Sequence, residues 1–148
     1  MKQKVTFDPK QVYDFELEKT LDESVLLKQL GKAIESGQKK SLEVKVSNTD
    51  RTFGTILGSE ITEKLGDEVE EDTYHVLCKG AGGQSFGAFI PKGLTLELVG
   101  DSNDYFGKGL SGGKLIVYPS EACKFKAEEN IIIGNVALYG ATGGKAFI

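Results

Sequence analysis

The chain has 148 residues, of which 39% are hydrophobic and 27% charged, and this size and composition predict one globular domain with a buried core. Its formal net charge of −4 argues against a dedicated nucleic-acid binder. No apolar run approaches the roughly 20 residues that span a bilayer, and the N-terminus MKQKVTFDPKQ lacks the apolar core of a secretion signal. We therefore expect a cytoplasmic protein with no membrane and no nucleic-acid partner.

The first part of the chain, residues 1–72, carries helix and strand signals. The segment DESVLLKQLGKAIESG (22–37) predicts a helix that Asp22 caps at its start and Gly37 ends in the left-handed conformation. Its apolar side chains recur every three or four residues and form one face, made by Leu26, Leu27, Leu30 and Ile34. Further along, SLEVKVS (41–47) predicts a strand with one wet face, TILGSEITEKLG (55–66) predicts a second helix, and the acidic run GDEVEEDT (66–73) predicts a solvated loop.

The second part, residues 73–148, is rich in glycine. Of the 19 glycines, 14 lie between Gly80 and Gly144, and the short β-type runs between them have neither the length nor the period of a helix. We expect strands at YHVLCK (74–79), QSFGAFI (84–90), LTLELV (94–99), KLIVYP (114–119), ENIIIG (129–134) and KAFI (145–148). The prediction is one structural domain, in which a helix- and strand-containing segment (1–72) leads into glycine-rich β-coils (73–148).

An imperfect repeat runs through these coils. An aromatic residue followed by glycine recurs at Phe53-Gly54, Phe86-Gly87, Phe106-Gly107 and Tyr139-Gly140. Such a repeat favours a mainly β fold, a parallel β-helix or solenoid, with a barrel or a sandwich as the alternatives. Glycine is needed where such coils turn or approach closely. The glycines that we assign to this structural motif are Gly83, Gly87, Gly100, Gly107, Gly109, Gly112, Gly113, Gly134, Gly140, Gly143 and Gly144.

The stretch GDSNDYFGKGLSGGKLIVYP (100–119) is the strongest candidate for a binding loop. A phosphate loop requires glycine six residues before the lysine of GK and Ser or Thr after it, and neither GK step meets this pattern. The spacing of Gly107, Gly109 and Gly112 matches a dinucleotide fingerprint, but it precedes a strand instead of opening a helix. Asp101 and Asn103 begin a calcium-loop pattern that Tyr105 interrupts. A small-molecule or metal site here stays an alternative to the interpretation we prefer, a turn tied by Asp101, Asn103 and Asp104.

Other candidates for chemistry are few. The only histidine, His75, lies in an alternating run and predicts a strand-face residue. Cys78 and Cys123 are far apart and predict reduced, partly buried thiols, since no cysteine pair or cluster fits zinc or iron–sulfur. Asp50, Glu97, Asp101 and Asp104 are acid–base candidates, but nothing in the sequence pairs them. The residues alone predict no catalytic, cofactor-binding or metal-binding site.

The order of three segments carries a family resemblance. NTDRTFGTILGSEI, then GQSFGAFIPKGLTLELVGDSNDYFGKGLSGGKLIVYP, then ENIIIGNVALYGATGGKAFI, resembles the C-terminal GXGXG domain of the glutamate synthase large (alpha) subunit. The resemblance runs from about Val44 to Ile148. A more distant resemblance is to the formylmethanofuran dehydrogenase component that shares the glycine-rich repeat. The resemblance implies a right-handed parallel β-helix with a short α-containing N-terminal segment.

The resemblance also implies a role in glutamate biosynthesis and nitrogen metabolism. Glutamate synthase is an oxidoreductase that makes glutamate from glutamine and 2-oxoglutarate, with an amidotransferase domain and a synthase domain that holds FMN and an iron–sulfur cluster. The GXGXG domain implies a non-catalytic, structural part that packs with those two and holds no cofactor itself. The alternatives are a subunit of a formylmethanofuran dehydrogenase-like complex and a stand-alone oligomeric binding protein.

The departures from the family pattern are that residue 2 is lysine, so no N-terminal cysteine nucleophile is present, and that the chain stops at KAFI. We expect no catalytic activity from this chain alone. We also expect the domain to be truncated at its C-terminal end and to form homo-oligomers through an open coil end, where backbone groups would be unpaired.

Overall fold

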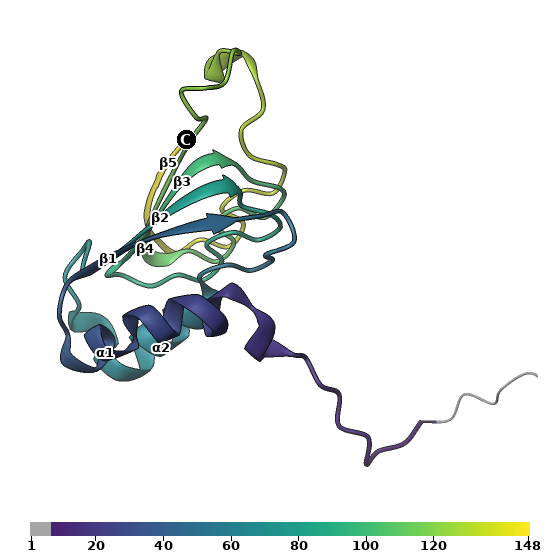
Figure 1. The fold of residues 1–148 in the computed structure, drawn as a ribbon, viewed down its shortest axis with the longest axis vertical. Helices are drawn as coiled ribbons and strands as arrows, with labels where there is room; N and C mark the ends of the chain where they lie inside the picture. The colour runs from purple at the N-terminus through teal and green to yellow at the C-terminus, as the bar shows by residue number, and fades with distance from the viewer. Residues whose placement is uncertain (1–6) are drawn as a thin grey trace, which may run out of the picture.

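A computed structural model describes residues 7–148, so the N-terminal stretch that includes Lys2 lies outside the described residues. The structure contains two α-helices and five strands, and all of the strands lie in one sheet with the order β1-β2-β3-β4-β5 (Figure 1). The elements are α1 (Leu27–Ser36), β1 (Lys40–Val46), α2 (Thr55–Leu65), β2 (Tyr74–Ala81), β3 (Leu94–Asp101), β4 (Ser111–Tyr118) and β5 (Gly143–Phe147). Every neighbouring pair of strands is parallel.

The two predicted helices form, and they pack together beside β1 (Figure 1). A π-helical turn, Asp22–Leu26, leads into α1, and Gly37 ends α1 with φ 66°, where its N–H bonds to the carbonyls of Ala33 and Ile34. The prediction that Gly37 stops this helix is confirmed. The apolar faces of both helices join the core through Leu26, Leu30, Ile34, Leu57 and Ile61.

The sheet is built from alternating side chains. On β2 and β3, the even-numbered residues are buried, because they face the core, while most odd-numbered ones face outward. Tyr74, at the start of β2, is fully buried, and its hydroxyl donates to the carbonyl of Ala33 in α1 at 3.2 Å. This hydrogen bond joins the helices to the sheet.

The turns that connect the strands lie one against the next and complete the core. Backbone N–H groups of Gly87 and Gly107 donate to the carbonyls of Phe53 and Phe86, so successive turns are in register. The rings of Phe53, Phe86 and Phe106 are fully or almost fully buried and stack with centroid separations of 5.4 and 6.0 Å. Three of the four predicted aromatic–glycine steps therefore form one buried row.

The fourth step, Tyr139-Gly140, does not join this row. Leu138 takes the place of its glycine, since the Leu138 N–H donates to the Phe106 carbonyl. Tyr139 is exposed. The pattern in the sequence is thus out of register by two residues at the last turn.

The prediction of a right-handed parallel β-helix is wrong. The structure is a small α/β domain with one five-stranded parallel sheet and two helices. Strands form at the predicted runs 41–47, 74–79, 94–99, 114–119 and 145–148, with shifted ends, but QSFGAFI forms turns and ENIIIG forms irregular chain with an isolated bridge. In QSFGAFI, alternate residues take positive φ, namely Ser85 (58°), Gly87 (69°) and Phe89 (60°), and extended strands do not tolerate these angles.

Candidate functional site

The outer face of the sheet, which turns away from the core, carries rows of side chains that run across the strands. Paired residues of parallel strands point to the same side, so the register defines each row. The first row is Ser41, His75, Thr95, Lys114 and Lys145; the second is Glu43, Leu77, Glu97, Ile116 and Phe147; the third is Lys45, Lys79, Val99 and Tyr118.

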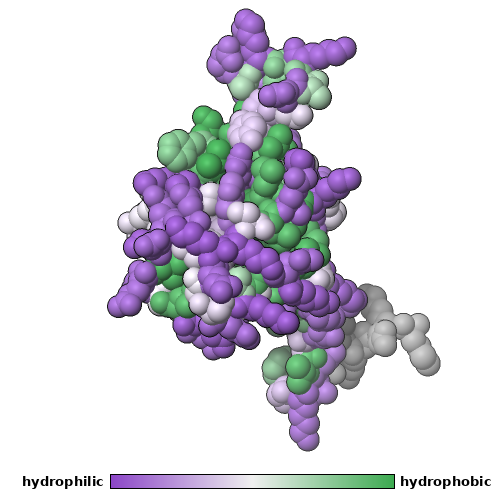
Figure 2. Space-filling view, turned by 60° about the vertical axis from the view of Figure 1, so that its left-hand side comes forward, coloured by the Kyte–Doolittle hydropathy of each residue, from purple (hydrophilic) through white to green (hydrophobic). Residues whose placement is uncertain are grey.

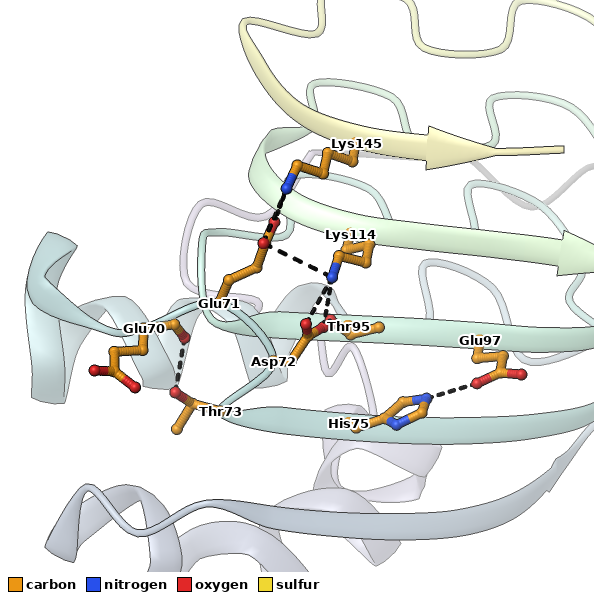
Figure 3. A network of polar contacts seen from close by, with 9 residues as sticks. All are labelled: Glu70, Glu71, Asp72, Thr73, His75, Thr95, Glu97, Lys114 and Lys145. Carbon is orange, nitrogen blue, oxygen red and sulfur yellow. Dashed lines mark hydrogen bonds and ion pairs between the residues drawn. The ribbon is translucent and has the colours of Figure 1, made fainter.

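Two lysines of the first row are paired with acids from the loop before β2 (Figure 3). Asp72 Oδ2 lies 2.6 Å from Lys114 Nζ, and the Glu71 carboxylate lies 2.7 Å from Lys145 Nζ and 3.8 Å from Lys114 Nζ. Thr95 Oγ1 donates to Asp72 Oδ1 at 2.5 Å. The hydrogen bond from Lys145 lowers the pKa of Glu71, and the one from Lys114 lowers the pKa of Asp72. The acidic loop is therefore tied to β4 and β5.

Three polar residues form a hydrogen-bonded chain across β2, β3 and β4. His75 Nε2 lies 2.8 Å from Glu97 Oε2, and the hydroxyl of Tyr118 donates to Glu97 Oε1 at 2.6 Å. The hydrogen bond to Glu97 raises the pKa of Tyr118, because the carboxylate disfavours a phenolate beside it. The prediction that His75 is a strand-face residue is confirmed.

A cleft of about 650 Å³ lies where the outer face meets the long segment between β4 and β5. This segment projects from one end of the molecule, and Figure 2 shows hydrophobic atoms gathered between it and the body. Apolar side chains dominate the lining, with Lys79 and Asp101 among the polar residues. The apolar lining residues are Val99, Pro119, Phe125, Ile131 and Ile132. The cleft offers apolar contact area next to the hydrogen-bonded chain of Glu97 and Tyr118.

The cysteines occupy different surroundings. Cys78 is fully buried on β2, where burial raises the pKa of its thiol well above the ordinary range and keeps it neutral. Cys123 is exposed and lines the cleft. Both are free thiols. Within residues 7–148, no group of three or more His, Cys, Asp and Glu side chains is placed to hold a metal ion.

The candidate loop 100–119 is divided among β3, a turn and β4. In the turn, Asp104 Oδ1 accepts a hydrogen bond from the backbone N–H of Asn135 at 2.8 Å, and the Ser102 hydroxyl donates to the carbonyl of Gly83 at 3.0 Å. Asp104 thus ties the backbone as expected, across to the next turn along the chain. For Asp101 and Asn103 the turn-tying role stays a prediction.

The acid–base candidates lie in separate elements. Asp50 Oδ2 accepts from the Ser47 N–H in the loop after β1, Glu97 lies on the outer face, and Asp101 and Asp104 lie at the end of β3 and in the turn after it. In the part of the chain that the structure describes, no hydrogen bond joins any two of them. The arrangement offers no general acid–base pair.

The predicted motif glycines lie in turns and in strands. Those in turns are Gly83, Gly87, Gly107, Gly109, Gly134 and Gly140, and those in strands are Gly100, Gly112, Gly113, Gly143 and Gly144. The structure brings Gly87 and Gly107 together against the side chain of Leu115, which a Cβ at either position would meet. Gly100 lies beside Gly80 of β2, where a Cβ would overlap the Gly80 carbonyl oxygen. Their role as a functional signature stays a prediction.

The sequence did not reveal three further features. Asp22 is buried and does not cap its own helix; its carboxylate accepts hydrogen bonds from Gly54 and Leu57 at the start of α2. The pairing of Glu71 with Lys145 spans 74 residues. The cleft depends on a segment whose position the sequence does not encode locally. The only sequence signal for any of these was the presence of unpaired charges at regular strand positions.

Comparisons with known proteins match this geometry to a family. A model of the GXGXG motif family matches residues 22–148. The large chain of glutamate synthase [NADPH] from Bacillus subtilis is 52% identical over 133 residues, which cover 89% of this chain and 9% of the relative. Glutamate synthase [NADH] from Schizosaccharomyces pombe is 53% identical over 116 residues, and ferredoxin-dependent glutamate synthase 2 from Synechocystis is 49% identical over 100 residues. These cover 78% and 68% of this chain, and 6% of either relative.

The chain belongs to the GXGXG motif family, and the resemblance inferred from the sequence is confirmed. It is a domain of the kind that glutamate synthase large chains contain. The chain spans less than a tenth of the length of these relatives. In the described residues, neither helix is long and apolar enough to cross a membrane.

Proposed function

We propose that this chain is a non-catalytic structural domain of a glutamate synthase, which packs with the glutamine amidotransferase part and the synthase part of that enzyme. The observation that carries the proposal is the family match over residues 22–148, together with 52% identity to the Bacillus subtilis large chain. The enzyme as a whole forms glutamate from glutamine and 2-oxoglutarate. This domain's contribution is to hold the other parts in place.

The chemistry of the described residues supports a structural role. The polar groups of the outer face contact one another: His75 and Tyr118 bind Glu97, and Lys145 binds Glu71. Within residues 7–148, every buried side-chain nitrogen or oxygen atom has a hydrogen-bond partner. Groups that are satisfied by their neighbours position a surface instead of reacting with a substrate.

The proposal assigns FMN and the iron–sulfur cluster to the partner parts and no cofactor to this domain, and it places the protein in the cytoplasm. The cleft beside Val99 and Ile131 offers apolar area for contact with a partner part. The chain also forms homo-oligomers in this proposal, since β5 is the last strand of the sheet and exposes Phe147 beside a turn that exposes Tyr139.

A domain exchange tests the scaffold role. The matched segment of the Bacillus subtilis large chain is replaced with this chain, and glutamate formation from glutamine and 2-oxoglutarate is measured. We expect the exchanged enzyme to keep its activity, and a second exchange that carries Gly100→Ala to lose it with the loss of the fold. An exchanged enzyme that is folded and loaded with flavin but forms no glutamate would contradict the proposal.

The isolated chain supplies the complementary test. We expect no glutaminase turnover and no flavin absorbance from it, and turnover with a bound cofactor would overturn the non-catalytic assignment. Light scattering over a range of concentrations checks the homo-oligomer, because a strictly monomeric chain at high concentration contradicts that part alone.

A further inference from the structure

The edge strand β5 is held to the sheet with little help from burial. All five of its residues are exposed or half-buried, and only Ala146 packs against the core. Its pairing with β4 is also interrupted by a register shift between Ser111 and Lys114. Because apolar burial is the main stabilising term for a strand, the attachment of β5 depends on a short backbone ladder and on side-chain contacts.

One of those contacts opposes the attachment. Lys114 and Lys145 are register partners on β4 and β5, and both extend over the outer face toward the same acidic loop (Figure 3). Like charges directly opposite each other on neighbouring strands repel and destabilise the pair. Without a counter-charge, the two ammonium groups would push β5 away from β4.

Glu71 supplies that counter-charge to both lysines at once. Its carboxylate lies 2.7 Å from Lys145 Nζ and 3.8 Å from Lys114 Nζ, and Asp72 completes the neutralisation of Lys114 at 2.6 Å. Asp72 has no ion pair to Lys145 in the described residues, so Glu71 is the acid that joins the loop before β2 to the edge strand. Its neighbour Glu70 points away and pairs with Lys39 at 3.3 Å.

We propose that Glu71 is an electrostatic latch, which holds the edge strand β5 on β4 and whose loss lets β5 leave the sheet reversibly while the rest of the domain stays folded. The latch sets whether the outer backbone edge of the sheet is β5 or β4. It therefore controls which strand can pair with another chain. The inference rests on the contacts of Glu71 alone and does not depend on the proposed function.

Hydrogen exchange of the β5 amides tests the latch. In Glu71→Gln, we expect the protected β5 amides to exchange about two- to fivefold faster than in the wild type at low salt, as befits a solvent-exposed ion pair. The protected amides of β2 and β3 keep their wild-type rates. Salt at about 1 M reduces the difference between the two proteins, because it screens exposed charges.

The second variants separate a latch from general destabilisation. In Glu71→Gln/Lys145→Gln, the repelling ammonium is gone, and we expect β5 exchange to return close to the wild-type rate. Glu70→Gln is the matched control and leaves β5 exchange unchanged. The latch is overturned if β5 exchange in Glu71→Gln equals that of the wild type, if the double variant exchanges as fast as Glu71→Gln, or if the rates of all strands rise together.

Discussion

Asp22 caps the helix that begins after Gly54, a helix in which it does not itself lie. Its Oδ1 accepts a hydrogen bond from the Gly54 N–H at 2.9 Å, and its Oδ2 accepts one from the Leu57 N–H at 3.0 Å. The carboxylate is almost fully buried, and a negative charge at a helix N-terminus is favoured by the helix dipole. This one side chain therefore fixes the start of α2 to the start of the segment that leads into α1.

The first prediction concerns the loss of this cap. Asp22→Ala leaves two buried N–H groups without acceptors, and we expect the free energy of unfolding to fall by about 3 kcal/mol. Glu23→Gln, at the neighbouring partly exposed position, is the control and changes it by less than about 0.5 kcal/mol. Urea denaturation measures both. Equal stabilities for the two variants would show that the cap contributes nothing.

The second prediction concerns pH. Burial raises the pKa of Asp22, and this effect outweighs the backbone hydrogen bonds that lower it. A carboxyl with a raised folded-state pKa contributes stability that is present below its unfolded pKa and lost as the pH rises through the folded value. Relative to Asp22→Asn, which does not titrate, the wild type should lose stability as the pH rises from about 4 toward 7. Denaturation curves at several pH values that stay parallel for the two proteins would refute this.

The third prediction contrasts two glycines. A Cβ at Gly100 would overlap the carbonyl oxygen of Gly80 on the neighbouring strand, so we expect Gly100→Ala to cost about 3 kcal/mol or more. Gly31 lies in α1 with open space around it, and Gly31→Ala should stabilise the protein by up to about 1 kcal/mol, because alanine favours helix. Thermal unfolding of both variants is the check, and similar melting temperatures would contradict it.

The fourth prediction concerns the stacked aromatic row. Phe86 lies between Phe53 and Phe106 and is fully buried, so Phe86→Ala opens a cavity and should cost about 3–5 kcal/mol. Phe86→Leu refills part of that space and should cost clearly less. Phe125→Ala, at an exposed position, should leave the melting temperature almost unchanged. A cost for Phe86→Ala no greater than that for Phe125→Ala would show that the row is not part of the core.

The fifth prediction concerns the pair of Tyr118 and Glu97. The hydrogen bond to the carboxylate raises the pKa of Tyr118, so Glu97→Gln should shift phenol ionisation to lower pH. Tyrosine-labelled NMR can follow this one ring, with exposed Tyr139 as the internal reference. If Tyr118 titrates at the same pH in both proteins, the hydrogen bond does not form in solution.

The sequence predicted several local features correctly, each for a local reason. Gly37 ends α1 because glycine adopts φ 66° without steric cost. The alternation of Leu42, Val44 and Val46 marks β1, since side chains on a strand alternate between faces. For the same reason His75 lies on a strand face. The three segments that resemble the GXGXG domain also sufficed to identify the family.

The expected β-helix was wrong because the pattern of short apolar runs does not report backbone angles. Nothing in QSFGAFI distinguishes it from a strand, yet Ser85 and Phe89 take positive φ, since the turn they form bonds to the turns on either side. The same limit applies to Tyr139-Gly140, which resembles the other aromatic–glycine steps but lies outside their row. Register between turns is set by contacts that span tens of residues.

What the sequence determined by itself is the set of helices, most of the strands and the family, because periodicity, capping glycines and ordered motifs act over short distances. Only the tertiary structure decided that Asp22 caps α2 and that Glu71 meets Lys145. It also decided that the segment between β4 and β5 forms a cleft over the outer face. These contacts join residues far apart in the chain, and they exist only after the strands have paired in parallel and brought those residues to one edge or one face.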